Sequence, residues 1–166
     1  MRTEEGIPPD WDWRERPAAP GPAIVVDIDG VLSDAANRQH FLDREVKDWR
    51  GFFEACADDP VIEEMKVLLD LLDPGIRVVL LTARPIRLLE ITRAWLHRYE
   101  IRWDLLVMRD RRRGHESSLE FKREVVGELR GYGFDVRLGV EDDRRNVEML
   151  RGSDVPTLYV HSGYYD

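Results

Sequence analysis

The stretch that decides the fold is Ala23-Ile24-Val25-Val26-Asp27-Ile28-Asp29-Gly30-Val31-Leu32. Residues 23–28 are apolar at almost every position, and the run stops at Asp29-Gly30, which is a turn signal. An uninterrupted apolar run of this length is typical of a strand that is buried on both faces. We therefore expect a strand of a parallel sheet that is covered by helices on both sides.

The rest of the chain alternates strand-like and helix-like patterns. Four further apolar runs predict strands at residues 76–81, 105–108, 135–140 and 157–160. Apolar residues at three-to-four spacing predict helices over residues 61–72, 86–99, 119–129 and 144–150. Strands that alternate with helices form βαβ units, so the sequence predicts an α/β fold, a Rossmann-like three-layer sandwich with a central parallel sheet.

Residues 1–22 differ in composition from the rest of the chain. They hold five of the nine prolines and two tryptophans: Pro8, Pro9, Pro17, Pro20, Pro22, Trp11 and Trp13. Because proline fixes φ and lacks a backbone donor, we expect an extended Pro-rich N-terminal arm whose tryptophans pack on the domain formed by residues 23–166. A proline-rich segment that binds a partner is the alternative.

Residues 33–60 interrupt the alternation of strands and helices. This segment holds two aromatic stretches, at residues 40–42 and 49–53. We expect a small helical cap insertion of one or two helices over the carboxyl ends of the strands, where ligands bind in open α/β sheets. The alternative is a plain connecting insertion packed on the sheet edge.

The charge balance limits the classes of partner. The 166 residues include 25 Lys and Arg against 33 Asp and Glu, a formal net charge of −8. This balance argues against a general electrostatic grip on nucleic acid, although a local basic patch can still contact phosphates.

The single cysteine, Cys56, excludes an intramolecular disulfide and a multi-cysteine zinc site. Because no apolar run is long enough to span a membrane, we expect a soluble, cytoplasmic protein. The sequence leaves its oligomeric state open, a homodimer included.

Two carboxylates end the first predicted strand. Residues two apart on a strand point to the same side, so Asp27 and Asp29 would repel each other unless a cation or a shared proton compensates. The simplest compensation is a magnesium ion, which prefers oxygen ligands. Gly30 lets the backbone turn sharply and lets a ligand approach closely.

Further polar residues follow the other predicted strands. Thr82, Ala83 and Arg84 end the second strand, where a hydroxyl, backbone N–H groups and a guanidinium can bind phosphate oxygens. Three acids end the fourth strand: Glu141, Asp142 and Asp143. Lys122, near the start of a predicted helix, is the candidate cation beside them. All of these groups converge on one edge of one sheet.

In this order, the motifs resemble those of the haloacid dehalogenase (HAD) superfamily of phosphotransferases. The first motif is matched by residues 27–32, the second by Thr82, the third by Lys122 and the fourth by Glu141-Asp142. Within the superfamily the chain is most similar to the phosphatase half of phage and bacterial polynucleotide kinase-phosphatases. The stretches that carry this likeness are residues 79–84, 105–109, 121–124, 134–138 and 147–150.

The resemblance implies a role for each matched residue. Asp27 would be the nucleophile that becomes an aspartyl phosphate, and Asp29 the general acid and then the base. Thr82 would bind the transferring phosphoryl group, while Lys122 would neutralise the charge on Asp27 and the phosphate. Magnesium would be held by the Asp27 carboxylate, the Asp29 backbone carbonyl and Asp142, supported by Glu141. We also expect the neighbouring carboxylate to raise the pKa of Asp29 toward its role as an acid.

Substrate contacts are expected around these groups, from Gly30, Arg38, Ala83, Arg84, Arg112 and Arg113. The sequence departs from the polynucleotide kinase type at Glu116 and Ser118, where an arginine and an acid are usual, and Asp143 is an alternative metal ligand. No G-x-x-x-x-G-K-[ST] loop is found, so no kinase half is expected.

The resulting prediction is a magnesium-dependent phosphomonoesterase. Its substrate is a phosphorylated compound: a polynucleotide 3′ end, a nucleotide or a small metabolite. A catalytically degenerate HAD fold that serves as a binding module is the non-enzymatic alternative.

Overall fold

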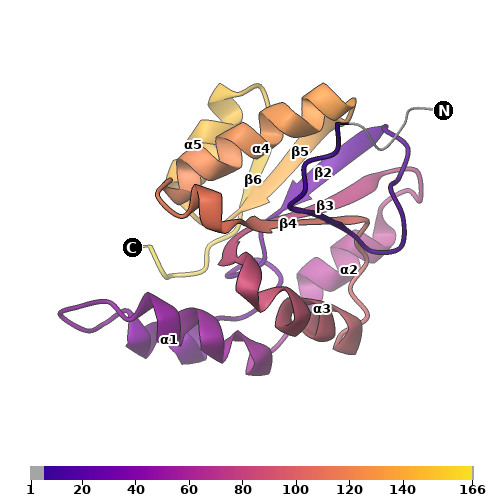
Figure 1. The fold of residues 1–166 in the computed structure, drawn as a ribbon. Helices are drawn as coiled ribbons and strands as arrows, with labels where there is room; N and C mark the ends of the chain where they lie inside the picture. The colour runs from indigo at the N-terminus through magenta and orange to yellow at the C-terminus, as the bar shows by residue number, and fades with distance from the viewer. Residues whose placement is uncertain (1–5, 166) are drawn as a thin grey trace.

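A six-stranded sheet runs through the molecule and is covered by helices on both faces (Figure 1). The computed structural model describes residues 6–165. The strands are β1 (Trp11–Trp13), β2 (Pro22–Val26), β3 (Arg77–Pro85), β4 (Leu105–Arg109), β5 (Asp135–Glu141) and β6 (Thr157–Tyr159). The helices are α1 (Trp49–Glu54), α2 (Glu63–Leu71), α3 (Leu89–Arg98), α4 (Ser118–Tyr132) and α5 (Arg144–Gly152). Short 3-10 turns are η1 (Ala36–Phe41), η2 (Ala55–Asp58), η3 (Ile86–Leu88) and η4 (Arg111–Arg113).

The strand order β1-β4-β3-β2-β5-β6 places β2 at the centre, between β3 and β5. Strands β2 to β6 pair in parallel, and β1 pairs antiparallel with β4. Figure 1 shows α4 and α5 on one face of the sheet and α2 and α3 on the other. The α/β Rossmann-like prediction is confirmed, with an antiparallel edge strand added to the parallel sheet.

Burial on both faces explains the uninterrupted apolar runs. Val26 points into the core that contains Leu69 and Trp95 of α2 and α3. Its neighbour Val25 points into the opposite core, with Phe121 and Val125 of α4. Because successive side chains of a strand alternate between faces, both positions must be apolar when helices cover both faces.

The N-terminal segment contributes a strand that the sequence analysis did not anticipate. Trp11 pairs with Val107 and Trp13 with Leu105 in the β1–β4 register. The Trp11 side chain is only 6% exposed, and its ring packs edge-on against Tyr132 with a centroid distance of 5.3 Å. A three-residue strand between prolines has too short an alternation to be recognised from sequence. Residues 1–5 of the predicted arm lie outside the described residues.

Residues 33–60 connect β2 to α2 through η1, α1 and η2. Figure 1 shows α1 beyond the edge of the sheet to which the strand arrowheads point, and the role of this segment as a cap stays a prediction. Phe52 of α1 is buried, and the Arg38 guanidinium of η1 stacks over its ring at 4.3 Å. No helix within residues 6–165 is both long enough and apolar enough to cross a membrane.

Replacement of Trp11 tests the contribution of β1. We expect Trp11→Ala to lower the free energy of unfolding by about 3 kcal/mol, because it removes a large buried aromatic side chain. Trp49→Ala is the matched control, since Trp49 is 49% exposed. Urea denaturation measures both variants, and similar losses for the two would show that β1 does not stabilise the domain.

Candidate active site

The turn after β2 brings the backbone close to the end of β5. Asp27 follows β2 directly, and its Oδ1 accepts a hydrogen bond from the Ile28 N–H at 2.8 Å. Gly30 has a φ of +81°, which favours glycine, and a Cβ placed there would lie 2.1 Å from Asp142 Oδ2. A side chain at position 30 would therefore displace the Asp142 carboxylate. The sequence predicted that Gly30 allows a ligand to approach closely, and the structure adds that it makes room for Asp142.

Lys122 reaches the strand ends from the buried face of α4. Its neighbours on that face, Phe121, Val125 and Val126, are apolar and fully buried. Lys122 Nζ lies 3.2 Å from Asp27 Oδ1 and donates to Glu141 Oε1 at 2.7 Å. Burial alone would lower the pKa of Lys122, but the charges of Asp27 and Glu141 outweigh it and raise the pKa. The lysine therefore stays charged between two carboxylates.

Asp142 lies in the same group without a hydrogen-bond partner. Both of its carboxylate oxygens are buried, and neither accepts a hydrogen bond from the described residues. Burial, and next the negative charge of Asp27, raise the pKa of Asp142 to about 7. Burial and Asp27 likewise raise the pKa of Glu141, against the opposing effect of Lys122. Burial is the larger cause of both shifts, and it acts in a group where three carboxylates face the single ammonium of Lys122.

A divalent cation fits this group of residues. One carboxylate oxygen from each of Asp27, Glu141 and Asp142 lies within 4.8 Å of the others. The donors are all oxygen, as hard cations such as magnesium prefer, and the two unpartnered oxygens of Asp142 are available to a ligand. Asp143, the alternative ligand, is instead the N-cap of α5: its Oδ1 accepts from the Arg145 N–H at 2.9 Å.

Asp29 faces a different set of partners from Asp27. Its Oδ1 accepts from Arg38 Nη2 and from Arg84 Nη2, each at 2.6 Å. Arg38 also donates from Nε to Asp59 Oδ1 at 2.8 Å and from Nη2 to Asp59 Oδ2 at 2.6 Å. Arg84, Arg38 and Asp59 are all at most 2% exposed. Two arginines and two aspartates thus form a buried, charge-balanced network beside the first group.

The network corrects the expectation that a neighbouring carboxylate raises the pKa of Asp29. Burial by itself would raise it, but the charges and hydrogen bonds of Arg84 and Arg38 outweigh burial and hold the pKa well below its usual range. Asp29 is therefore ionised at neutral pH in this arrangement. The guanidinium groups of Arg38 and Arg84 are engaged by carboxylates, so their role as substrate ligands stays a prediction.

The end of β3 places the remaining predicted phosphate ligands. The Thr82 side chain is buried, and its Oγ1 accepts from the Arg84 N–H at 3.2 Å. Ala83 follows it and is half-buried. Both residues lie on the strand next to β2, as the motif order predicted, and their contacts with a phosphoryl group stay a prediction.

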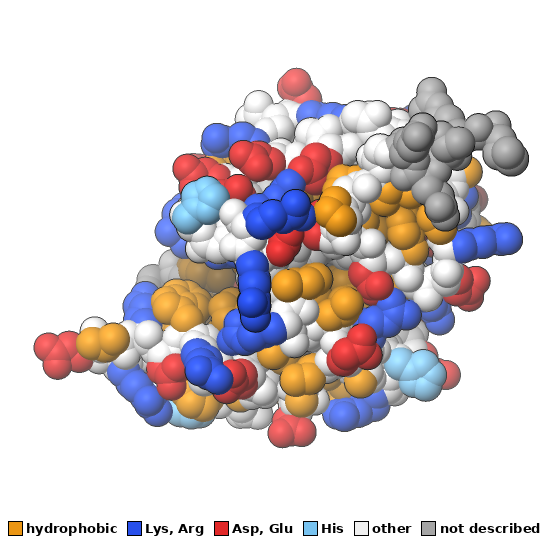
Figure 2. Space-filling view, in the orientation of Figure 1, with side chains coloured by type: hydrophobic (Ala, Val, Ile, Leu, Met, Phe, Trp, Pro, Cys, Tyr) orange, Lys and Arg blue, Asp and Glu red, His pale blue; other side chains and the backbone are white. Residues whose placement is uncertain are grey.

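The two arginines expected at the mouth of the site differ in environment. Arg112 is exposed, and its Nε donates to Asp110 Oδ2 at 2.7 Å. Arg113 is largely covered and forms an ion pair with Glu128 of α4. Figure 2 shows Lys and Arg side chains gathered on the front of the molecule, between the region of α4 above and that of α3 below. The ion pair of Arg112 is thus exposed and that of Arg113 is covered, and contact of either arginine with a substrate stays a prediction.

Three residues of the site were not found from the sequence. Asp59 lies at the end of the cap, and its carboxylate also accepts from Ser33 Oγ at 2.7 Å. Asn146 of α5 donates to Glu141 Oε1 at 3.2 Å. Ser33 directly follows the first motif, but a lone serine there gave no signal. For Asp59, an acid that closes an insertion containing several arginines was a signal.

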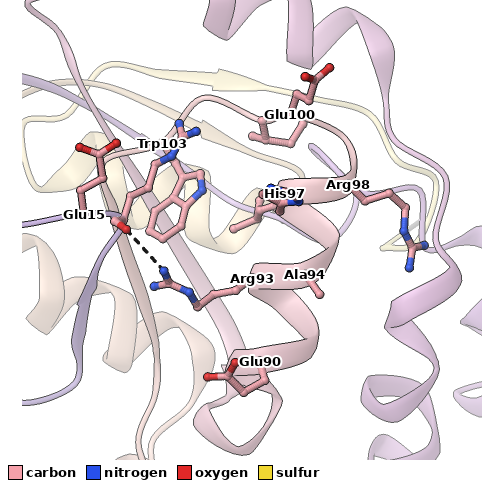
Figure 3. A pocket seen from close by; sticks show the side chains of 11 residues that line it. Glu15, Glu90, Arg93, Ala94, His97, Arg98, Glu100 and Trp103 are labelled. Carbon is pink, nitrogen blue, oxygen red and sulfur yellow. Dashed lines mark hydrogen bonds between the residues drawn. The ribbon is translucent and has the colours of Figure 1, made fainter.

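A separate pocket lies between α3 and the segment after β1 (Figure 3). It is lined by both signs of charge, including Glu90, Arg93, His97 and Glu100, and by Trp103, which precedes β4. Trp103 stands at the amino end of its strand, whereas Asp27 and Asp142 stand at carboxyl ends. This pocket is therefore distinct from the carboxylate site.

The fold and the site together define the HAD class of phosphatase: a parallel α/β sheet with Asp-x-Asp after its central strand, a hydroxyl after the next, and a helix lysine beside paired acids. A sequence model described as "Polynucleotide kinase PNKP phosphatase domain" matches residues 21–165. The chain therefore belongs to the family of PNKP phosphatase domains, within the HAD-type phosphatases.

Solved structures show the same fold. A chain of the Pnkp1/Rnl/Hen1 RNA repair complex is similar at a TM-score of 0.68 and 24% identity, over 90% of this chain and 45% of that chain. The HAD domain of effector protein Lem4 from Legionella pneumophila is similar at a TM-score of 0.50 and 14% identity, over 89% of this chain and 90% of that chain. The present chain thus spans less than half the length of the chain in the repair complex. A comparison with curated proteins found no match.

Removal of one carboxylate tests the metal-binding group. We expect magnesium to raise the melting temperature of the unaltered chain, because a ligand that binds only the folded state stabilises it. Asp142→Asn should remove most of this shift while leaving the metal-free protein at least as stable, since it relieves repulsion with Asp27. Asp43→Asn, at an exposed position, is the control. Thermal denaturation with and without magnesium measures the effect, and an undiminished shift in Asp142→Asn would contradict the assignment.

The low pKa of Asp29 makes the stability of the fold depend on pH. The folded-state pKa lies below that of the unfolded chain, so the stabilisation is complete above the ordinary Asp pKa of about 4 and is lost as the pH falls below it. Between pH 5 and 3 we expect the free energy of unfolding to fall more steeply in the unaltered chain than in Asp29→Asn, by at most about 1.4 kcal/mol per pH unit. Urea denaturation at each pH measures the two slopes, and equal slopes would show that the arginines do not hold Asp29 ionised.

Proposed function

We propose that this protein is a magnesium-dependent phosphomonoesterase that acts through an aspartyl phosphate on Asp27 and removes 3′-phosphates from polynucleotide ends. The observation that carries this proposal is the pairing of Asp27 with Lys122 beside the unpartnered, buried oxygens of Asp142. A nucleophilic carboxylate, a fixed cation and free metal ligands are the components that phosphoryl transfer needs. Family membership supports the same activity.

In the first step, an Asp27 oxygen would attack phosphorus while the bond from phosphorus to the leaving oxygen breaks. The other Asp27 oxygen is held by the Ile28 N–H, which fixes the rotation of the carboxylate. Lys122 neutralises charge on Asp27 and the arriving phosphoryl oxygens. A magnesium ion held by Asp27, Asp142 and the Asp29 backbone carbonyl, with Glu141 beside Asp142, would supply further neutralisation of the phosphoryl charge. Water would then cleave the phosphorus–oxygen bond to Asp27 and release inorganic phosphate.

Asp29 would give a proton to the leaving oxygen and take one from the attacking water. In the present arrangement it is ionised, which suits the second of these tasks. A phosphate anion would compete with Asp29 for the guanidinium groups of Arg38 and Arg84. Each hydrogen bond transferred to the substrate removes one cause of the low pKa, so substrate binding itself would bring Asp29 closer to the protonated state.

Polynucleotide ends are supported by two observations. The matching family is that of polynucleotide kinase phosphatase domains, and a similar chain belongs to an RNA repair complex. Arg112 is exposed, and its guanidinium would suit contact with a further substrate phosphate if the substrate reaches it. A nucleotide or small-metabolite phosphatase and a catalytically degenerate binding module are the competing functions. Cytoplasmic location stays a prediction from the sequence.

Hydrolysis by matched variants tests the activity. The unaltered chain should release phosphate from 3′-phosphorylated oligonucleotides and from p-nitrophenyl phosphate only when magnesium is present. Asp27→Asn should reduce kcat by at least about a thousandfold, because the amide removes the nucleophile. Asp43→Asn should retain full activity. Faster release from 5′-phosphorylated oligonucleotides or nucleotides would redirect the substrate assignment, and no release from any of these would favour the binding module.

A further inference from the structure

The segment after β6 crosses the site on the side opposite the β4 edge. The Val160 N–H donates to the Glu141 carbonyl at 2.9 Å, which continues the β5–β6 pairing toward the catalytic edge. Ser162 then packs against the first motif: a Cβ built on Gly30 would lie 3.2 Å from Ser162 Cβ. Figure 1 shows the end of the chain between α1 and the pair of helices α4 and α5. We refer to residues 162–165 as the strap.

The strap is fixed at its far end to the base of the cap. Gly163 turns the backbone with a φ of +79°, and the Tyr164 N–H donates to Ser162 Oγ at 3.3 Å. The Tyr164 hydroxyl donates to Asp34 Oδ1 at 2.8 Å. Asp34 in turn is held by its own N–H, which donates to the Pro60 carbonyl at 2.9 Å. The strap therefore joins β6 to the point where the cap leaves and rejoins the domain.

Tyr165 follows this anchor, and its ring has no aromatic partner among the described residues that would cover it. Its side chain is 52% exposed. Partial burial, and then the negative charges of Asp142 and Asp27, raise the pKa of its phenol. The ring is carried on the strap, whose Ser162 packs against Gly30 next to Asp142, and it is open to solvent.

We propose that the strap forms one wall of the active-site mouth and that Tyr165 stacks on the terminal nucleoside of the substrate. This inference rests on the proposed phosphatase function and adds a specificity-determining residue to it. An exposed tyrosine ring on an anchored backbone offers a flat surface at small entropic cost, and every nucleobase can stack on it. A small phosphomonoester without a base would gain nothing from the ring.

Substrates with and without a terminal base test the stacking. Tyr165→Ala should lower kcat/KM for an oligonucleotide 3′-phosphate by about tenfold, within the range that base–aromatic stacking supports. The loss should disappear when the terminal nucleotide is abasic, and Tyr165→Phe should retain activity because the ring remains. Tyr159→Ala, which removes another exposed tyrosine, is the control. Equal losses on both substrates, or a Phe variant as weak as the Ala variant, would overturn the proposal.

A binding measurement keeps this test separate from that of the phosphatase function. In the Asp27→Asn chain, which cannot form the aspartyl phosphate, a 3′-phosphorylated oligonucleotide ending in 2-aminopurine should lose fluorescence on binding as its base stacks. Adding Tyr165→Ala should restore the fluorescence of the bound oligonucleotide, whereas Tyr165→Phe should not. Quenching that Tyr165→Ala leaves unchanged, or no binding at all, overturns the strap proposal. The phosphatase function fails instead if the unaltered chain hydrolyses no phosphomonoester.

Discussion

The site depends on the way negative charge is compensated where the parallel strands end. Asp27, Glu141 and Asp142 lie within reach of one ion, and Lys122 is the cation paired with two of them. In a buried environment an uncompensated carboxylate is costly, and the raised pKa values of Glu141 and Asp142 express that cost. Because these carboxylates outnumber the nearby positive charges, binding of a divalent cation is favoured. The added positive charge in turn allows a phosphate anion to approach the carboxylates.

A second group of buried charged residues lies next to the metal-binding carboxylates, and in this group positive and negative charges are equal in number. Asp29 and Asp59 offset Arg38 and Arg84, and their hydrogen bonds join the end of β2, the end of β3 and both ends of the cap. Breaking such a buried network by removing one partner is expected to cost about 3–5 kcal/mol, because a charge remains uncompensated. The network therefore fixes the cap relative to the sheet, and any transfer of a guanidinium to substrate would loosen that connection.

The sequence predicted the sheet well because its strands are buried on both faces and carry a strong apolar signal. It also predicted that Asp27, Lys122 and Asp142 meet, because carboxyl ends of parallel strands share one edge. It could not predict the partners of Asp29. Residues two apart point to the same side only within a strand, and Asp27 and Asp29 lie beyond the end of one. β2 ends at Val26, so the turn rotates the two carboxylates toward different cations. Asp59 and the strap contact the site through tertiary packing, which leaves no periodic pattern.

This division of the two motif aspartates bears on their chemistry. A nucleophile has to be ionised and close to a metal, whereas an acid has to gain a proton when the leaving oxygen departs. If both carboxylates shared one ion, both would be driven toward the ionised form. Separation places Asp27 beside Lys122 and the acids of β5, and places Asp29 under the control of two arginines that are themselves suited to phosphate. The charge state of Asp29 is then linked to the occupancy of the site by substrate, because the same two arginines would bind the phosphate.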